Sequence, residues 1–335
     1  MTAARATPRI FYLVSDYAAP SWGQGMLYQH VRLLVEAGFD AWVLHERRPF
    51  RLPWLDDELP IAYVEEMADP PQAHDLVIVP EVRATEALPW ACRRGVFVQG
   101  SFLPLLGDRP AVRYPELGFE FALAVMPHVA AVVERHFGIA AHLVPPCIAP
   151  YFLRSPAEIR DQQRERRVLL AAKPEYRRAG FPDYDIVTKL VGRSFAERGA
   201  GWRLQELAGL SHRQVAALMA STPLLVNLNT HEAFNSSVPE AMASGCVPVC
   251  FEAVGGRDFL TDGADAFVFD NHHAYALVDR LLELVEIEEG DPLRLLDMRL
   301  RARATAGLFS AAGTRDALVA VFSGLGAQRP TAVSR

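Results

Sequence analysis

The sequence is poor in cysteine and has no excess of positive charge. Its four cysteines, Cys92, Cys147, Cys246 and Cys250, are scattered over 335 residues without a CxxC pair. This pattern argues against a disulfide framework and against a zinc site, and it suits a reducing compartment. The formal net charge is −6 at pH 7. Because phosphate contacts need a basic surface, this charge disfavours a nucleic-acid partner, and we expect none.

Long apolar runs are absent as well. No uninterrupted stretch of the sequence approaches the ~20 apolar residues that span a bilayer. Residues 1–9 lack the apolar core of a signal peptide. We therefore expect a cytoplasmic protein, and we leave open a peripheral contact with the inner face of the membrane.

The sequence does contain the alternation that is typical of parallel β-α-β units. Its 335 residues exceed the ~250–300 at which a single hydrophobic core stops growing, so we expect two domains. Short apolar runs alternate with longer helical patterns. The expected strands are 10–15, 41–45, 75–79, 95–99 and 121–125 in the first half, and 167–172, 202–207, 224–228 and 247–251 in the second.

These elements predict an α/β protein with two doubly wound, Rossmann-like domains facing across a cleft. The first covers residues 1–150 and ends in a proline-rich hinge at 144–150, and the second covers 151–312. Residues 313–335 form an amphipathic helix that could return to the first domain, followed by a tail. In such sheets, ligands bind at the carboxyl ends of the strands.

The segment from Asn229 to Val249 carries the most specific chemical signal. A strand ends, a loop holds Glu232, and a helix that begins near Ser237 holds Glu240 in its opening turn. The unpaired amides and the dipole of a helix N-terminus suit a diphosphate, and the two carboxylates suit sugar and ribose hydroxyls. The alternative is a capping box between Ser237 and Glu240, in which Glu240 only caps the helix.

This segment resembles the E-x7-E signature of retaining GT-B glycosyltransferases, especially glycosyltransferase family 4. The family commonly reads E-G-F-G-x-x-x-x-E-A-M-A-x-G-x-P-V, and the frame here runs without a gap from Glu232 to Val249. The residues 255–259 (GGRDF) are similar to its G-G-x-E/D element, Gly23-Gln-Gly25 to its glycine-rich loop, and residues 144–152 to its hinge. The resemblance implies a GT-B fold with an N-terminal acceptor domain and a C-terminal nucleotide-sugar domain.

The resemblance also implies roles for individual residues. Glu232 would contact the donor sugar near the reacting carbon, and Glu240 would hold the ribose. The residues implied to line the diphosphate and the rest of the donor site are Phe234, Asn235, Ser236, Ser237, Gly23 and Gly25. Ala233 and Asn235 stand where the family keeps glycines, which let the backbone approach the donor closely. Asparagine tolerates unusual backbone angles better than most residues, so it is the milder replacement.

Cations for the donor phosphates follow the strand at 167–172. Lys173 with Arg177 or Arg178 could clamp the two phosphates and stabilise the charge that builds on the leaving nucleotide. Family 4 enzymes have a similar Arg/Lys pair at this point; the alternative is a solvated basic loop. Gly209 lies in a loop where main-chain groups could meet the base.

Two first-domain residues, Glu81 and Gln99, are candidates for the acceptor side. Glu81 follows one strand end, and Gln99 stands where many family 4 members have a histidine. The alternative for Glu81 is a solvated loop acid. Asp183-Tyr-Asp185 spells DxD, the metal site of another glycosyltransferase fold, but it precedes a helix, where acids suit the dipole. We expect no obligatory metal or other cofactor.

Taken together, these features predict a retaining glycosyltransferase in which Glu232, Lys173 and Arg178 carry the chemistry. The donor would be a UDP, GDP, dTDP or ADP sugar. The acceptor hydroxyl would belong to a glycan, a lipid-linked sugar or a small molecule, in glycan, glycolipid or natural-product glycoside synthesis. Two alternatives are an inactive sugar-nucleotide-binding or partner subunit and a nucleotide-sugar epimerase.

Overall fold

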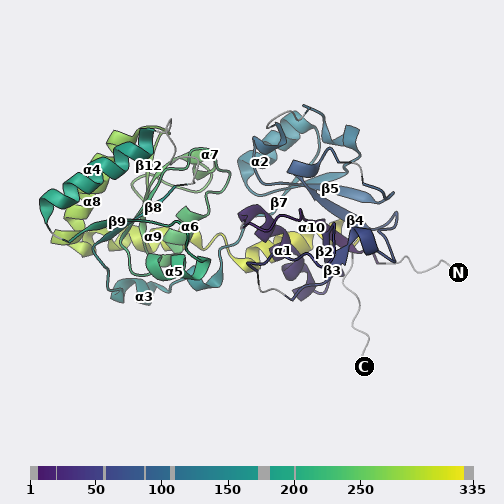
Figure 1. Ribbon diagram of the computed structural model, residues 1–335, viewed down its shortest axis with the longest axis horizontal. Coiled ribbons are helices and arrows are strands. Elements are labelled where there is room, and N and C mark those ends of the chain that lie inside the picture. The colour runs from purple at the N-terminus through teal and green to yellow at the C-terminus, as the bar shows by residue number, and fades with distance from the viewer. Residues whose placement is uncertain are drawn as a thin grey trace, which may run out of the picture. The chain divides into compact units, whose positions relative to one another are not determined.

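The computed structural model describes residues 7–19, 21–55, 58–86, 88–105, 110–172, 182–199 and 201–327. The chain divides into two compact units: unit 1 is Met1–Pro146 with Ala311–Arg335, and unit 2 is Cys147–Ser310. Each unit contains a parallel β-sheet with helices packed against it (Figure 1). The predicted pair of doubly wound α/β domains is confirmed.

The sheet of unit 1 has the strand order β3-β2-β1-β4-β5-β6-β7. Its strands are β1 (Ile10–Leu13), β2 (Ala41–His45), β3 (Ile61–Tyr63), β4 (Leu76–Pro80), β5 (Arg93–Val98), β6 (Phe121–Ala124) and β7 (Ala141–Leu143). The direction of winding reverses between β1 and β4, and that switch point is where this class of sheet opens a crevice at its carboxyl edge. Every residue of β1 and β4 is buried, as expected for parallel strands covered on both faces.

Helices α1 (Trp22–Glu36) and α10 (Ala311–Gly324) lie side by side on this sheet, while α2 (Pro127–Val132) follows β6 (Figure 1). Helix α1 begins at Trp22, directly after Ser21, which has an extended N-cap conformation. As a result, Gly23 and Gly25 lie in the first turn of α1 and not in a loop before it.

The sheet of unit 2 has the order β12-β11-β10-β8-β9. Its strands are β8 (Arg167–Ala171), β9 (Arg203–Glu206), β10 (Leu224–Asn227), β11 (Val247–Phe251) and β12 (Phe267–Phe269). Here the winding reverses between β8 and β10, so the loops after these two strands border the switch point.

Helices cover both faces of this second sheet (Figure 1). On one face, α4 (Pro182–Arg198) and α8 (Ala274–Gly290) form a buried apolar core with alternate residues of the strands. The other helices of the unit are α3 (Pro156–Asp161), α5 (His212–Met219), α6 (Ser237–Ser244), α7 (Ala253–Gly256) and α9 (Leu296–Ala306). Short 3₁₀ helices of unit 2 are η6 (Pro150–Phe152) and η8 (Pro292–Leu295). Those of unit 1 are η1 (Val64–Glu66), η2 (Glu81–Arg83), η3 (Leu103–Leu105) and η4 (Tyr114–Leu117), and η5 (Val133–Phe137) is a short π-helix of the same unit.

Three strands that we did not predict, β3, β7 and β12, lie at edges of the two sheets. Each has three residues, and none of these residues is fully buried. A three-residue strand is shorter than the roughly four to eight residues over which hydrophobic periodicity can be recognised, so the sequence pattern does not reveal it. No helix in the described part of the chain is both long enough and apolar enough to cross a membrane.

Candidate functional site

The candidate site of unit 2 is the loop between β10 and α6, at the switch point of the sheet. Hydrogen bonds among three asparagines hold this loop in place. Asn227, the last residue of β10, donates from Nδ2 to Asn235 Oδ1 at 2.9 Å and to Ser237 Oγ at 2.7 Å. Asn235 Nδ2 donates back to Asn227 Oδ1 at 3.0 Å, and Asn229 Nδ2 donates to Asn235 Oδ1 at 3.2 Å. The loop is therefore fixed before any ligand binds.

The network explains why asparagine can stand at position 235. Asn235 has a φ of 54°, in the left-handed region that favours glycine. Asparagine enters this region more readily than most residues, and here its side chain is buried and hydrogen-bonded at both ends. The backbone conformation that a glycine would allow is thus retained.

The loop is also packed directly against Gly255 in α7. The Gly255 amide donates to the Glu232 carbonyl at 2.9 Å. A Cβ atom on Gly255 would lie 1.6 Å from the carbonyl oxygen of Ala233, so no other residue fits there without moving the loop. Ala233 itself is buried. Gly255 therefore supports the loop through close backbone packing.

Phe234 anchors the middle of the loop in the core. Its ring lies 4.7 Å from that of Phe309 and 6.1 Å from that of Phe259, measured between centroids. The side chain of Phe234 therefore packs in the core of unit 2 and does not line the loop surface.

The two acidic residues of the motif flank the start of α6. Glu232 lies half-buried in the loop, and Glu240 is buried in the first turn, with 5% of its surface exposed. Glu240 Oε1 lies 2.9 Å from Nε2 of His212. Burial raises the pKa of the Glu240 carboxyl, while the hydrogen bond and charge of His212 act in the opposite direction.

The capping-box alternative for Glu240 is wrong. Ser237 is the first residue of α6 and not its N-cap, and its Oγ accepts from Asn227. The N-cap is Ser236, which makes no side-chain capping hydrogen bond, and the Glu240 amide donates to the Ser236 carbonyl. By contrast, Ser155 and Ser211 each form a complete capping box at the starts of α3 and α5. The side chain of Glu240 is therefore directed at His212 and does not serve as a helix cap.

The remaining donor-side candidates are only partly described. Lys173, Arg177 and Arg178, predicted to bind the phosphates, lie outside the described residues. Gly209 follows β9 at the same carboxyl edge of the sheet and has a φ of 70°.

The first-domain candidates come together at the switch point of unit 1. Gln99, after β5, donates from Nε2 to the Gly23 carbonyl at 3.1 Å, and its own amide donates to Glu81 Oε1 at 2.9 Å. Glu81 is only 3% exposed, so the alternative of a solvated loop acid is wrong. A Cβ on Gly23 would lie 2.1 Å from Gln99 Oε1, and one on Gly25 would lie 3.3 Å from Trp54.

Unit 1 also contains a row of three hydrogen-bonded side chains that we did not predict. Asp16, after β1, accepts from or pairs with His45 Nδ1 at 2.9 Å, and His45 Nε2 lies 2.7 Å from the Tyr28 hydroxyl. Burial lowers the pKa of His45, and Asp16 opposes that shift. The signal that could have found this row is the position of Asp16 and His45 at the ends of adjacent strands.

The DxD residues do not act together. Asp183 is buried and accepts from or pairs with His272 Nδ1 at 2.6 Å, whereas the exposed Asp185 pairs with Lys189 at 2.9 Å. Across the described ranges, no group of three or more His, Cys, Asp and Glu side chains is placed to hold a metal ion.

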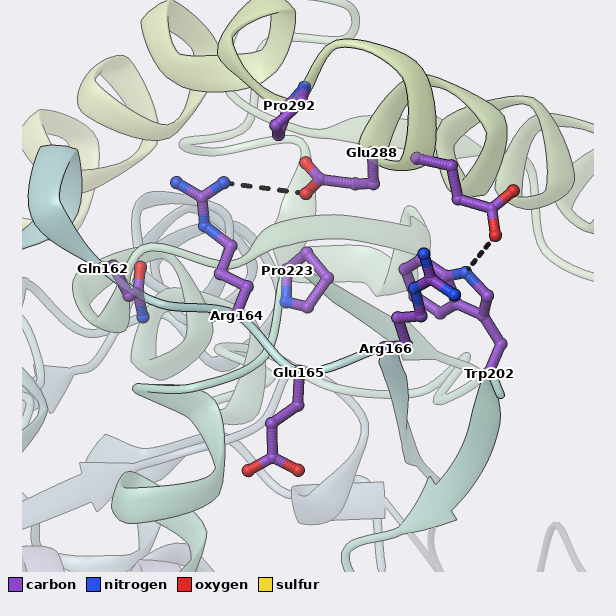
Figure 2. Close-up of a pocket in the computed structure, with 9 residues that line it drawn as sticks. Gln162, Arg164, Glu165, Arg166, Trp202, Pro223, Glu288 and Pro292 are labelled. Carbon is purple, nitrogen blue, oxygen red and sulfur yellow. Dashed lines mark hydrogen bonds and ion pairs between the residues drawn. The ribbon is translucent and has the colours of Figure 1, made fainter. Parts of the chain in front are cut away.

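A cavity of about 240 Å³ lies at the opposite edge of the unit 2 sheet (Figure 2). Residues 162–166 precede β8, Trp202 precedes β9 and Pro223 precedes β10, so the cavity adjoins the amino ends of the strands. In Figure 2 Arg164 points toward Glu288, with 3.6 Å between the charged groups. Because such sheets bind ligands at the carboxyl edge, we do not assign this cavity to the site.

Several known glycosyltransferases are similar to this chain in sequence. Residues 194–304 match the family described as "Glycosyl transferases group 1". Over 221 residues the chain is 32% identical to the D-inositol 3-phosphate glycosyltransferase of Nocardia farcinica. The aligned region is 65% of this chain and 44% of that protein. Over 102 residues it is 26% identical to the GDP-mannose:cellobiosyl-diphosphopolyprenol alpha-mannosyltransferase of Xanthomonas campestris, covering 30% of this chain and 27% of that one. The matched region spans less than half the length of each of these curated relatives.

Solved structures share the fold over nearly the whole chain. A glycosyltransferase from Rickettsia africae ESF-5 superposes with a TM-score of 0.65 at 11% identity, covering 96% of this chain and 99% of that one. The Anabaena protein HepE in complex with UDP-glucose gives 0.66 at 13% identity, with 94% and 99% covered. These likenesses show a two-domain, Rossmann-like GT-B fold, and with the family match they support a GT-B glycosyltransferase.

Proposed function

We propose that this chain transfers a sugar from a nucleotide-diphosphate donor to a hydroxyl acceptor, with retention of anomeric configuration. The observation that carries the proposal is the fixed loop at the β10 carboxyl end, with Glu232 before α6 and Glu240 in its first turn. Doubly wound sheets bind nucleotides at such a switch point, and helix N-termini bind phosphate. The family match at residues 194–304 includes this entire segment.

In this proposal the donor lies along the loop. Glu232 contacts the sugar hydroxyls, the main-chain amides of 234–237 line the diphosphate, and Glu240 accepts from the ribose hydroxyls. Lys173, with Arg177 or Arg178, stabilises the charge on the leaving nucleotide, and the loop at Gly209 meets the base. The acceptor oxygen forms its bond to the anomeric carbon on the face from which the phosphate departs, and the leaving phosphate takes the acceptor proton.

We place the acceptor hydroxyl near Glu81 and Gln99 in unit 1. Both residues follow neighbouring strands, β4 and β5, and a hydrogen bond joins them. A lipid-linked sugar or a small phosphorylated polyol is a suitable acceptor to test, because the two curated relatives are named for acceptors of these kinds.

A nucleotide screen followed by a transfer assay tests this function. We expect one of UDP, GDP, dTDP and ADP, at about 100 times its Kd, to stabilise the protein by about 2.7 kcal/mol in a thermal-shift assay. NMR of the product should then show the anomeric configuration of the donor. Glu232→Ala should lower kcat at least about 100-fold while nucleotide still stabilises the fold.

Three outcomes would contradict the proposal. No stabilisation by any nucleotide would remove the donor site. Conversion of the donor sugar without an acceptor would favour an epimerase, and tight nucleotide binding without turnover of any acceptor would favour an inactive binding subunit.

A further inference from the structure

Glu240 is the end of a chain of three side chains that crosses unit 2. Its Oε1 atom lies 2.9 Å from His212 Nε2, and the other ring nitrogen of His212, Nδ1, lies 2.6 Å from the Tyr151 hydroxyl. Tyr151 lies in η6, close to Cys147, where unit 2 begins; His212 is the first residue of α5. Three separate elements thus converge on one carboxylate.

Packing holds the His212 ring in place. Its centroid lies 4.8 Å from the ring of Phe152 and 5.5 Å from that of Tyr151. The Arg213 guanidinium in turn covers the Tyr151 ring at 4.8 Å. The capping box of Ser211 fixes the start of α5, so both the ring and the backbone that carries it are positioned.

The hydrogen-bond pattern divides the two oxygens of Glu240. With a proton on Nε2, His212 donates to Oε1 and accepts the Tyr151 hydroxyl proton at Nδ1. In the part of the chain that the structure describes, Oε2 has no hydrogen-bond partner. One oxygen is therefore used to orient the carboxylate, and the other is available as an acceptor.

We propose that His212, held by Tyr151, is a positioning residue that fixes Glu240 so that its second oxygen accepts from the ribose hydroxyls of the donor. The proposal rests on the nucleotide-sugar function proposed above and adds the residues that orient the ribose contact. The titratable and charged groups that face Glu240 from η6 and α5 are Tyr151 and His212, with Arg213 behind Tyr151. His212 is also what opposes the burial that raises the pKa of Glu240.

The test is nucleotide affinity, measured by calorimetry on the full chain with the nucleotide found in the thermal-shift screen. We expect His212→Phe to weaken binding about tenfold or more, because it removes a hydrogen bond to a charged group. His212→Gln, whose amide can still donate to Oε1, should recover much of that loss. Tyr151→Phe should have a smaller effect, and kcat at saturating donor should change little in all three variants. His136→Gln, at an exposed histidine of unit 1, is the matched control.

Two further measurements distinguish positioning from a general structural effect. Because loss of His212 leaves the burial of Glu240 unopposed, the acidic limb of nucleotide binding should move to higher pH in His212→Phe. In a Glu240→Gln background the same substitution should have no further effect, because the two residues act as a unit.

The outcomes separate this inference from the proposed function. If the wild-type chain binds no nucleotide, the proposed function fails and this inference fails with it. If the wild-type chain binds nucleotide, but His212→Phe binds it equally well with an unchanged pH profile, the inference alone is overturned. An effect of His212→Phe that persists in the Glu240→Gln background would also overturn it. If His212→Phe does not fold, His212→Gln is measured in its place, in the wild-type and the Glu240→Gln backgrounds. A shift of the acidic limb of nucleotide binding to higher pH in the wild-type background alone supports the inference, and no shift in that background overturns it.

Discussion

At the scale of single residues, Asn235 shows how a position that favours glycine can accept another residue. A left-handed conformation costs a residue with a Cβ about 1–2 kcal/mol. The hydrogen bonds that Asn235 makes with Asn227 and Asn229, each worth roughly 1 kcal/mol, offset this cost. The replacement therefore depends on two asparagines elsewhere in the sequence.

Substitutions at Asn235 separate these two contributions. Asn235→Ala loses the hydrogen bonds and keeps the unfavourable φ, so we expect it to lower the free energy of unfolding by about 2–4 kcal/mol. Asn235→Gly loses the same bonds but relieves the backbone, so its cost should be smaller by about 1 kcal/mol. Urea denaturation measures both values. If Asn235→Gly were less stable than Asn235→Ala, the positive φ of this residue would not be what makes alanine unfavourable here.

His30 predicts how stability depends on pH. It is fully buried beside Tyr12 and Phe97, and neither of its ring nitrogens has a hydrogen-bond partner among the described residues. Burial lowers the pKa of His30 from 6.5 to about 3. Between these two pH values the folded state binds fewer protons than the unfolded state. The free energy of unfolding is therefore unaffected by His30 above pH 6.5, and it falls as the pH drops from 6.5 toward 3.

Replacing His30 with leucine should remove this pH dependence. At pH 5 the wild-type chain should lose about 2 kcal/mol relative to pH 7.5 through this residue alone, since each pH unit below 6.5 costs about 1.4 kcal/mol. His30→Leu should lack that part of the loss, whereas His136→Gln, at an exposed histidine, should retain it. Denaturant unfolding at the two pH values measures the difference. Equal losses in wild type and His30→Leu would show that His30 does not titrate as a buried neutral ring.

At the scale of secondary structure, the sequence was most informative where strands and helices are fully buried. The predicted ranges of β2 and β11 coincide with those of the structure, because each is a short run of mostly apolar residues. The helix predicted to begin near Ser237 does begin there, as α6. The edge strands β3 and β12 are apolar but only three residues long, and they were missed.

From the sequence we predicted the site residues that lie within one motif, but not the residues from other segments that contact them. The motif places Glu232 and Glu240 by spacing, but His212 lies 28 residues before Glu240, and only the packing of α5 on α6 brings them together. The asparagine network was missed for a different reason: its members are close in sequence, but asparagines at a strand end and in a loop are common in turns and so give no specific signal. Long-range pairs such as His212 and Glu240 leave no periodic signal.

The contact between α7 and the loop gives a matched pair of glycine substitutions. A Cβ on Gly255 would lie 1.6 Å from the Ala233 carbonyl oxygen, whereas one on Gly256 would meet only a Leu260 methyl at 3.3 Å. We expect Gly255→Ala to displace the loop and to weaken nucleotide binding at least about tenfold, at a cost in stability of about 1–3 kcal/mol. Gly256→Ala should change both quantities little, because a side-chain methyl can move. Calorimetry and urea unfolding measure them, and equal behaviour of the two variants would contradict the role of close backbone packing.

At the scale of the whole molecule, the two candidate sites lie on different units. Glu240 belongs to unit 2, whereas Glu81 and Gln99 belong to unit 1, and each group lies at the switch point of its own sheet. If the units bind different substrates, as we propose, a substitution in one unit should affect the binding of one substrate only.

We expect Glu240→Gln to raise the Kd for nucleotide about tenfold, through loss of a charged hydrogen bond, with little change in the KM for acceptor. Glu81→Gln should do the opposite, raising the acceptor KM while the nucleotide Kd stays within about twofold. The isosteric amide preserves volume in both variants, so packing alone would not produce this crossed pattern. Steady-state kinetics with both substrates varied, combined with calorimetry for nucleotide, measures all four values. If either variant changes donor and acceptor binding equally, the two sheets do not divide the substrates between them.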